Sequence, residues 1–433
     1  MRRSHKLAVA LTAAATLTFT MAACSGSGGG DAGGKKVVTW STWGTPDELK
    51  AFEAFNAQFM EKHSDIKVVF QPVPSYDEYH SKLNTQLTSG TAPDVFYLGD
   101  DKVTAVAVNN VLEPINSYIE AAGSAITLDQ FTPEIYRVAT IDDKIYGLPN
   151  DVNPDALWYD KEALKTAGIT EDPAELAKSG EWTTDKFLEM TGKLKAADLH
   201  GAVYWNYWAT HASWMVTQGG EVYNEDGDYV ANTDATSVAA MDVMAQKFQN
   251  GEFVVADTMP KGNDADTGLV THKIGFLVQG RYTISTIEGA GLDVNGYDVV
   301  RWPTPDGAEG SSAVAASFLA INAKSKNKDA AYTFFSEFLS KDGQETRLAD
   351  NGNALPSITG LDHLVTDSGK PANAQALIDM RDNGFSNFPA EAAVPNLSNQ
   401  ISNDFMLKLY QGKATTQETL DGVAALVKEK TSK

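Results

Sequence analysis

The chain has 433 residues, with 35 Lys and Arg against 57 Asp and Glu, which gives a formal net charge of −22 at pH 7. An acidic molecule of this kind repels phosphate backbones and anionic lipids, which argues against nucleic-acid binding and against membrane binding through a basic face. The chain has one cysteine and therefore no intramolecular disulfide. A hydrophobic content of 42% over this length is enough for two lobes with separate cores.

The N-terminus has the pattern of a secretory signal. Basic residues precede an apolar stretch, 7–23, which is too short and too rich in threonine for a transmembrane helix of about 20 apolar residues. The small residues before Cys24 resemble a lipobox, and acylation would account for an unpaired thiol in an exported protein. The alternative is an ordinary signal peptide followed by an incidental cysteine. We predict a lipoprotein signal peptide over 1–23 and a palmitate-containing lipid anchor on Cys24.

The segment after Cys24 has the composition of a flexible tether. Residues 25–36 are rich in Gly and Ser and cannot form a core. As a random coil, such a segment has a root-mean-square reach of about 20 Å, so the folded body would stay close to the membrane. We therefore assign 24–36 to the acylated cysteine and its tether, and we expect the protein on the extracytoplasmic face of the cell membrane.

The first part of the body alternates strands and helices. β-Branched and aromatic runs predict the strands, and capping boxes at 45–48 and 75–78 predict the helix starts. The predicted order is strand 37–41, helix 46–63, strand 66–70, helix 76–89 and strand 94–98. Strands separated by single helices pair in parallel, and ligands of such sheets bind beyond the carboxyl ends of the strands. The loops expected to meet there are 42–45, 73–75 and 99–102.

A second lobe is predicted from the change of amino-acid composition after Gly147, where Gly, Pro, Asn and Asp cluster as in a loop. Later patterns predict extended runs at 156–160, 299–305 and 316–321, a hairpin turn at 224–228, and helices at 161–167, 182–197, 238–248 and 329–339. The tail returns to helical patterns from Ala374 and from Asp404. We assign 37–149 plus about 303–350 to lobe 1, and 150–302 plus about 351–433 to lobe 2.

Catalytic and metal-binding motifs are missing from the sequence. It has no nucleophile elbow, P-loop, dinucleotide fingerprint or zinc-protease motif, and the histidines are scattered. The acidic clusters at 225–228 and 264–266 lack the spacing of a calcium loop. We therefore expect no catalytic residue, no metal and no cofactor. A glycosidase, which needs only two suitably placed carboxylates, stays open as the enzymatic alternative.

Tryptophan is the more informative residue type. Flat aromatic faces stack on the apolar faces of pyranose rings, and several of the eight tryptophans fall in predicted loops. Trp40 alternates within a strand and is expected in the core, whereas Trp43 follows the carboxyl end of that strand. Polar residues that could accept sugar hydroxyls stand in nearby predicted loops, and aromatic and polar residues alternate over 204–208. The alternative for all of these residues is ordinary core and turn packing.

Several short motifs occur in one order along the chain. They are S-G-x-x-P-D-V at 89–95, then Asp151 with 156–160, then 276–281, 301–305 with 317–321, 325–331 and 352–356. In this order, and together with the lipobox, they resemble the family 1 extracellular solute-binding proteins of the maltose-binding-protein type. The second motif departs from the family pattern at Asn150, Trp158 and Thr166, and little beyond Pro356 matches.

The resemblance implies a fold and a function. The fold is α/β and two-lobed, of the periplasmic-binding-protein type, with the lobes joined by more than one crossover and a ligand clamped between them by hinge closure. The function is capture of a carbohydrate, with an oligosaccharide favoured, and its delivery to the permease subunits of an ABC transporter. We expect a monomer that is attached to the membrane only through its lipid and binds no nucleic acid. A peptide or polyamine binder of the same fold is the alternative ligand class.

The resemblance also places the ligand-binding residues. On the first lobe they would be Trp43, Asp100 and Asp101, and on the second Asp151, Asn153, Trp205 and Trp208. Further candidates are Arg281, for which a salt bridge is the alternative role, and Ser317 and Phe318. A loop that contains Phe385, Asn387 and Phe388 is also expected near the cleft.

Overall fold

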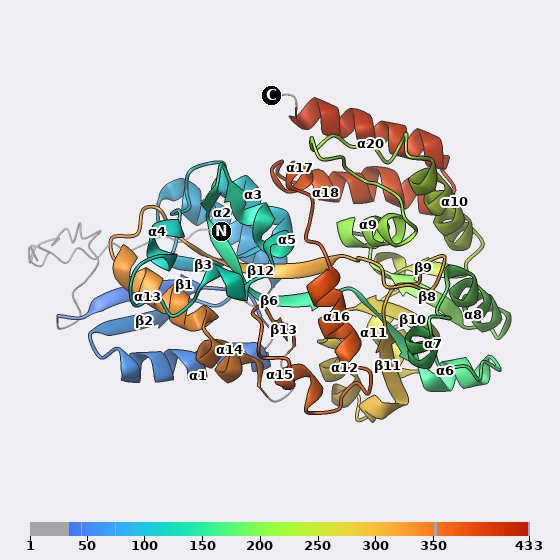
Figure 1. The fold of residues 1–433 in the computed structure, drawn as a ribbon, viewed down its shortest axis with the longest axis horizontal. Coiled ribbons are helices and arrows are strands. Elements are labelled where there is room, and N and C mark those ends of the chain that lie inside the picture. The colour runs from blue at the N-terminus through green and yellow to red at the C-terminus, as the bar shows by residue number, and fades with distance from the viewer. Residues whose placement is uncertain (1–33, 45, 74, 350–352, 432–433) are drawn as a thin grey trace, which may run out of the picture.

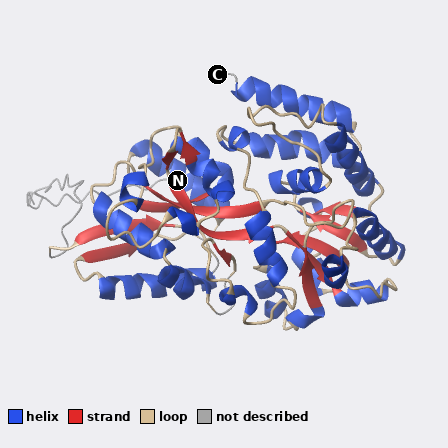
Figure 2. Ribbon diagram, in the orientation of Figure 1, coloured by secondary structure: helices blue, strands red, loops and turns tan. Residues whose placement is uncertain are grey.

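A computed structural model describes residues 34–44, 46–73, 75–349 and 353–431. The predicted signal peptide, Cys24 and most of the tether lie outside these residues. The described chain forms two α/β lobes, each built on one sheet, with strands in the interior and helices outside (Figures 1 and 2).

The sheet of the first lobe has six strands in the order β13-β6-β12-β3-β1-β2. β1 pairs in parallel with β2 and β3, as predicted, whereas β12 runs antiparallel to β3 and β6. The strands are β1 (Lys36–Ser41), β2 (Ile66–Phe70), β3 (Val95–Gly99), β6 (Gly147–Pro154), β12 (Val314–Ile321) and β13 (Leu355–Pro356).

Helices cover both faces of this sheet. Figure 1 places α1 and α14 on one side and α3 on the other. The helices are α1 (Pro46–Lys62), α2 (Tyr76–Ser89), α3 (Asp100–Ala107), α4 (Asn116–Ile119), α5 (Pro133–Tyr136), α13 (Lys328–Leu339), α14 (Lys341–Leu348) and α15 (His363–Thr366). A small hairpin of β4 (Thr140–Ile141) and β5 (Lys144–Ile145) completes the lobe.

Local sequence explains the start of α2 and of α3. The Ser75 hydroxyl accepts the backbone N–H of Glu78 at 3.4 Å, and Gly90 ends α2 with φ 71°, in the left-handed region that glycine tolerates. Asp100 and Asp101 were expected in a loop, but they form the first turn of α3. Carboxylates are favourable there because they face the positive end of the helix dipole.

The sheet of the second lobe has five strands in the order β11-β7-β10-β8-β9. β8 is parallel to β9 and β10, and β7 runs antiparallel to β10 and β11. The strands are β7 (Ala156–Asp160), β8 (His200–Tyr204), β9 (Phe253–Val255), β10 (Ile274–Gln279) and β11 (Tyr297–Val300). The surrounding helices are α6 (Lys161–Thr166), α7 (Pro173–Ser179), α8 (Thr184–Ala196), α9 (Trp208–Thr217), α10 (Ala235–Gln249), α11 (Ala265–Val270) and α12 (Thr283–Gly289).

The C-terminal segment completes the second lobe. A π-helical stretch, Ile401–Met406, and α20 pack on each other, and α20 also packs on α10. α17 contacts α3 of the first lobe as well as α18 and α20, so it bridges the lobes. The helices are α16 (Gln375–Asn383), α17 (Pro389–Ala392), α18 (Leu397–Gln400), α19 (Leu407–Tyr410) and α20 (Thr416–Thr431).

The sheets divide the chain differently from the predicted lobes at two places. Residues 150–154, predicted to open the second lobe, continue β6 in the first sheet, so the chain first crosses at Asp155. β13 (Leu355–Pro356), predicted in the second lobe, also pairs with β6. The composition of 147–154 suggested a loop because it contains Pro149 and Pro154. In the structure β6 pairs with β12 through a bulge: Ser317 pairs with Asp151 and Phe318 with Pro149, so Asn150 is an extra residue. Such a bulge accommodates a proline within a strand.

Six of the eight tryptophans are buried, although several were expected in loops. Five of them lie in the two large cores, and the sixth, Trp208, is 3% exposed in a small separate cluster. Each of the five is at most 1% exposed, and each indole N–H donates to an oxygen at 2.5–3.1 Å. A buried indole needs such an acceptor because an unpaired donor carries a desolvation penalty. The five are Trp40, as predicted, and Trp158, Trp182, Trp214 and Trp302.

Candidate functional site

A cleft of about 690 Å³ lies where the strand ends of the two sheets meet. The loop after β1 contributes Trp43, and the end of β3 with the start of α3 contributes Gly99, Asp100 and Asp101. The predicted convergence is confirmed for the loops 42–45 and 99–102. No described residue of the third predicted loop, 73–75, belongs to the lining, which at this point begins with Tyr76 of α2. The remaining lining residues are Tyr76, Asp151, Asn153, Asp155, Trp205, Asn206, Tyr207, Trp208, Asp257, Tyr282, Ala315, Ala316, Ser317, Ser398 and Asn399.

Eight of the ten predicted site residues line this one cleft. They are Trp43, Asp100, Asp101, Asp151, Asn153, Trp205, Trp208 and Ser317. The structure brings these eight residues together, whereas the two remaining candidates, Arg281 and Phe318, lie elsewhere.

Arg281 and Phe318 are buried away from the cleft. Side chains alternate along β12, so Ser317 faces the cleft while Phe318 points into the core and is 0% exposed. Arg281 is 1% exposed, and its Nη2 donates to the carbonyl of Leu364 at 3.2 Å. Its backbone N–H donates to Asn153 Oδ1 at 2.9 Å, so the turn after β10 orients a residue of the cleft. The nearby Phe385 and Phe388 pack around Trp208 and do not line the cleft either.

Aromatic rings line the cleft from both lobes. Trp43 is half-buried, with its ring held by Tyr76 at 4.9 Å and by Tyr97 at 5.5 Å in edge-to-face contacts. Tyr76 is 36% exposed and Tyr282, on the second lobe, is 40% exposed. Among the described residues these two and Val108 are the exposed large hydrophobic side chains, so two of the three lie in the cleft. The cleft therefore offers flat apolar faces to a ligand.

Asp100 is a buried carboxylate at the floor of the cleft. It is 7% exposed, and its Oδ2 accepts the backbone N–H of Ala316 at 3.1 Å. Burial, and then the charge of neighbouring Asp101, raise the pKa of Asp100 to about 8. At neutral pH this carboxyl can therefore either donate or accept a hydrogen bond.

Asp155 is paired with a tyrosine. Tyr207 Oη lies 2.5 and 2.6 Å from the two carboxylate oxygens and donates to them. Burial, followed by the charge of Asp155, raises the pKa of Tyr207 well above its usual value, so the hydroxyl stays protonated. Burial raises the pKa of Asp155 to about 7, although the hydrogen bond from Tyr207 acts in the opposite direction.

Two more aspartates are held by hydrogen bonds at the rim. Asp101 accepts the Tyr76 hydroxyl at 2.7 Å and forms an ion pair with Lys102 at 2.5 Å. Asp257 accepts the backbone N–H of Asn206 at 2.8 Å. These contacts fix the carboxylates in position before a ligand arrives, which lowers the entropic cost of binding.

The second-lobe segment after β8 carries polar atoms without a partner among the described residues. Trp205 Nε1 and Asn206 Oδ1 are buried and make no hydrogen bond, although Asn206 Nδ2 donates to Asn403 at 3.0 Å. The indole groups of the five core tryptophans are all paired. Both atoms belong to residues of the cleft lining, where a bound ligand could supply the missing hydrogen bonds.

Among the lining residues with polar or aromatic side chains, sequence reasoning missed eight as individual candidates: Tyr76, Asp155, Asn206, Tyr207, Asp257, Tyr282, Ser398 and Asn399. Asn206 and Tyr207 fall in the aromatic stretch already singled out. Asp257 follows β9, so the strand-end rule could have found it. Ser398 and Asn399 gave no signal, because only the tertiary fold brings α18 to the cleft.

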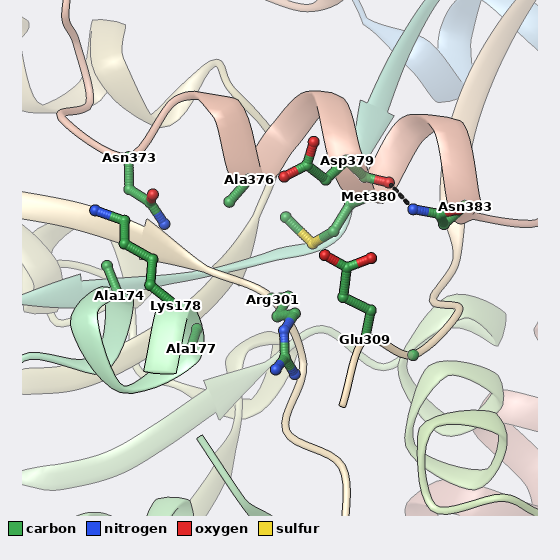
Figure 3. A pocket seen from close by; sticks show the side chains of 11 residues that line it. Ala174, Ala177, Lys178, Arg301, Glu309, Asn373, Ala376, Asp379, Met380 and Asn383 are labelled. Atoms are coloured by element: carbon green, nitrogen blue, oxygen red, sulfur yellow. Dashed lines mark hydrogen bonds between the residues drawn. The ribbon is translucent and has the colours of Figure 1, made fainter. Parts of the chain in front are cut away.

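A smaller cavity, of about 110 Å³, lies between α7, the loop after β11 and α16 (Figure 3). Its charged side chains come from three elements, and two of them, Lys178 and Arg301, already have partners within the protein. Lys178 pairs with Glu175 at 2.8 Å, and Arg301 donates to the carbonyls of Trp302 and Gly307. This cavity shares no residue with the cleft, and none of its lining residues has a buried polar atom without a partner in the described chain.

Other features of the described residues bear on the alternatives. They contain no group of three or more His, Cys, Asp or Glu residues placed to hold a metal ion. No helix in the part of the chain that the structure covers is long and apolar enough to cross a membrane.

Comparison with known proteins agrees with this geometry. The family model "Bacterial extracellular solute-binding protein" matches residues 43–345. The chain is 26% identical to the diacetylchitobiose binding protein DasA of Streptomyces coelicolor over 94% of each chain, and 23% identical to the galactooligosaccharide-binding protein of Bacillus subtilis over 83% of this chain and 82% of the relative.

Among solved structures, the fold is similar to that of the ABC substrate-binding protein Lmo0181 of Listeria monocytogenes, solved in complex with cycloalternan. The TM-score is 0.78 at 20% identity, with 91% of this chain and 98% of the other covered. The protein therefore belongs to the bacterial extracellular solute-binding proteins and has their two-lobed α/β fold.

Proposed function

We propose that this protein captures a carbohydrate, in particular an oligosaccharide, in the cleft between its lobes and delivers it to the permease of an ABC importer. The observation that carries the proposal is the combination of exposed aromatic rings with fixed carboxylates and amides in one cleft of about 690 Å³. A pyranose presents apolar ring faces and a rim of hydroxyls. Such a ligand needs both kinds of contact at the same time.

The relatives support the carbohydrate class. The two curated relatives described above are named for binding diacetylchitobiose and galactooligosaccharides, and the Listeria structure contains cycloalternan. These ligands differ in size and linkage. The shared feature is therefore the class of ligand, and the particular sugar depends on side chains that differ between these proteins.

The membrane attachment that we propose rests on the leader. Export through the signal peptide 1–23 and acylation of Cys24 would hold the folded body at the extracytoplasmic face of the membrane, where the permease is accessible. A tether of Gly and Ser would let the body turn toward the permease while it stays attached.

Calorimetric titration of the purified protein with a panel of mono- and oligosaccharides, amino acids and polyamines tests the function. Saturable 1:1 binding of a saccharide without its cleavage supports the proposal. Release of shorter saccharides over time would favour a glycosidase. Binding of non-sugars alone would keep the fold and overturn the carbohydrate class.

A further inference from the structure

Asn206 belongs to the cleft lining and lies just beyond the carboxyl end of β8, which ends at Tyr204. Ligands of parallel sheets bind at such strand ends. Two other elements hold the residue. Its backbone N–H donates to Asp257 Oδ2 at 2.8 Å, and its side-chain Nδ2 donates to Asn403 Oδ1 at 3.0 Å. The main chain and the side chain are therefore both oriented before a ligand arrives.

Asn403 comes from an unusual element. It lies in the π-helical stretch, Ile401–Met406, directly after α18, whose Ser398 and Asn399 also line the cleft. π-Helices are rare and often occur at functional sites. Asn206 and Asn403 are 197 positions apart in the sequence, so their contact depends on the tertiary fold.

The contact with Asn403 decides which atom of the Asn206 carboxamide remains for another partner. An asparagine side chain has one oxygen that accepts and one nitrogen that donates. Because Nδ2 is used, Oδ1 remains, and this oxygen is buried without a partner among the described residues. The indole Nε1 of Trp205, the preceding residue of the lining, is likewise buried and unpaired. Leaving a buried acceptor unpaired costs free energy that a ligand donor would recover.

The lining asparagine of the first lobe has the opposite arrangement. Asn153 Oδ1 accepts the backbone N–H of Arg281 at 2.9 Å, so the amide nitrogen of Asn153 is the group left to donate. The two carboxamides therefore differ in the atom that each has left for a ligand. Saccharide hydroxyls can serve both, since each hydroxyl donates one hydrogen bond and also accepts.

We infer that Asn206 is a specificity-determining residue, which accepts a hydrogen bond from an O–H or N–H group of the saccharide, and that Asn403 positions its carboxamide for this contact. The inference rests on the proposed function and deepens it. An ether oxygen at the same place has no hydrogen to donate, so it would leave Asn206 Oδ1 unpaired and be rejected.

Substitution of Asn403 tests the orientation of the carboxamide. Rotation of both side chains would keep the bond between Asn206 and Asn403 but turn the Asn206 nitrogen to the ligand. The carboxylate of Asn403→Asp only accepts, so it keeps Asn206 Oδ1 available, whereas the ammonium of Asn403→Lys only donates and favours the rotated carboxamide. A contact that served the fold alone would not make ligand affinity depend on this difference.

Calorimetric titration of the intact protein with maltose, cellobiose, lactose and N,N′-diacetylchitobiose selects the tightest binder as the probe. Asn206→Ala should raise its dissociation constant at least about fivefold, which corresponds to one hydrogen bond between neutral groups. Asn403→Asp should bind within about twofold of the parent, and Asn403→Lys should lose as much affinity as Asn206→Ala. The matched control is Asn232→Ala, which removes a 2.9 Å bond to Asp421 outside the cleft and should bind like the parent.

Thermal unfolding of the ligand-free variants separates binding from folding. Equal affinity of Asn206→Ala and the control would overturn the inference, and a lower melting temperature with unchanged affinity would assign Asn206 to an internal contact only. Equal affinity of Asn403→Asp and Asn403→Lys would overturn the role of Asn403. If the parent binds none of the four saccharides, the proposed function itself is contradicted.

Discussion

At the scale of single residues, the position of each tryptophan decides what it does. Trp40 and Trp43 are three residues apart, yet the first is fully buried with its N–H on Asn56 and the second stands half-buried in the cleft. The difference follows from the end of β1 at Ser41, since residues beyond the carboxyl end of the strand leave the core.

Replacement of Trp43 by alanine should weaken saccharide binding at least about tenfold, because large aromatic anchors carry much of the energy of a binding site. Trp43 is half-buried and packs on Tyr79 and Tyr97 at the edge of the core. The variant should therefore stay folded. Calorimetry gives the affinity, and circular dichroism checks the fold. Trp43→Phe is the matched control, because it keeps an aromatic face. Unchanged affinity in Trp43→Ala would remove this residue from the site.

Asp100 should make stability depend on pH. Its pKa is about 8 in the folded protein and about 3.9 in an unfolded chain, so the folded state holds more protons between about pH 4 and 8. The contribution of this group to stability is therefore fully present below about pH 4 and is lost as the pH rises toward 8.

Asp100→Asn should flatten this loss, because asparagine keeps the acceptor for the backbone of Ala316 and has no charge to bury. Urea unfolding at a series of pH values from about 4 to 9 measures it, with the exposed Asp226→Asn as control. An unchanged pH slope in Asp100→Asn, equal to that of the control, would contradict the prediction.

At the scale of elements, the central strand β6 shows how a sequence that departs from its family pattern is still accommodated. Asn150, where the family has an apolar residue, is the bulge residue of β6 and is 0% exposed. Its amide donates to the carbonyl of Ser317 at 3.0 Å, and its oxygen accepts the hydroxyl of Tyr97 at 2.6 Å and Arg347 Nη1 at 3.1 Å. Each polar group of the side chain therefore has a partner.

Arg347 is the partner that makes this arrangement stable. Its Nη2 also donates to the carbonyls of Asn150 and Phe338, and the guanidinium lies 3.8 Å from the ring centre of Phe338. Arg347→Ala should lower the free energy of unfolding by at least about 2 kcal/mol, because it leaves buried acceptors unpaired. Arg347→Lys should recover only part of it, since lysine lacks the planar fork. Denaturant unfolding measures both; a loss within the error of the exposed Lys341→Ala control would refute the prediction.

How much of the fold the sequence reveals depends on whether the signal is local. The first five elements were predicted within a few residues because caps and apolar periodicity lie within each segment. β6 was taken for a loop because its prolines are compatible with a strand only through the bulge opposite β12. The lining residues of α18 were missed because their position also depends on a tertiary contact: Ser398 Oγ donates to Glu391 Oε2, in α17, at 2.9 Å.

At the scale of the whole molecule, the lipid anchor and the binding body should be separable. Cys24→Ser removes the thiol that would be acylated, so the variant should appear in the soluble fraction. Its affinity for the ligand should match that of the parent, because Cys24 lies outside the described fold, whose first strand begins at Lys36. Fractionation and calorimetry of the same preparation test both parts, and retention of the variant in the membrane fraction would exclude Cys24 as the anchor.

The two lobes are joined by several crossings of the chain, which allow them to move relative to each other. The described chain crosses between the sheets three times, at Asp155, after β11 and after β13, so the lobes can bend about these crossings while each core stays packed. Tyr76 and Tyr282 stand exposed on opposite lobes, and closure around a ligand would bury both rings. Small-angle X-ray scattering should therefore show a smaller radius of gyration at saturating ligand. A saccharide that gives no heat in calorimetry is the control and should leave the radius unchanged. If the true ligand saturates the protein without reducing the radius, the lobes are already closed or do not move, and the proposed capture by closure would have to be replaced by binding to a rigid cleft.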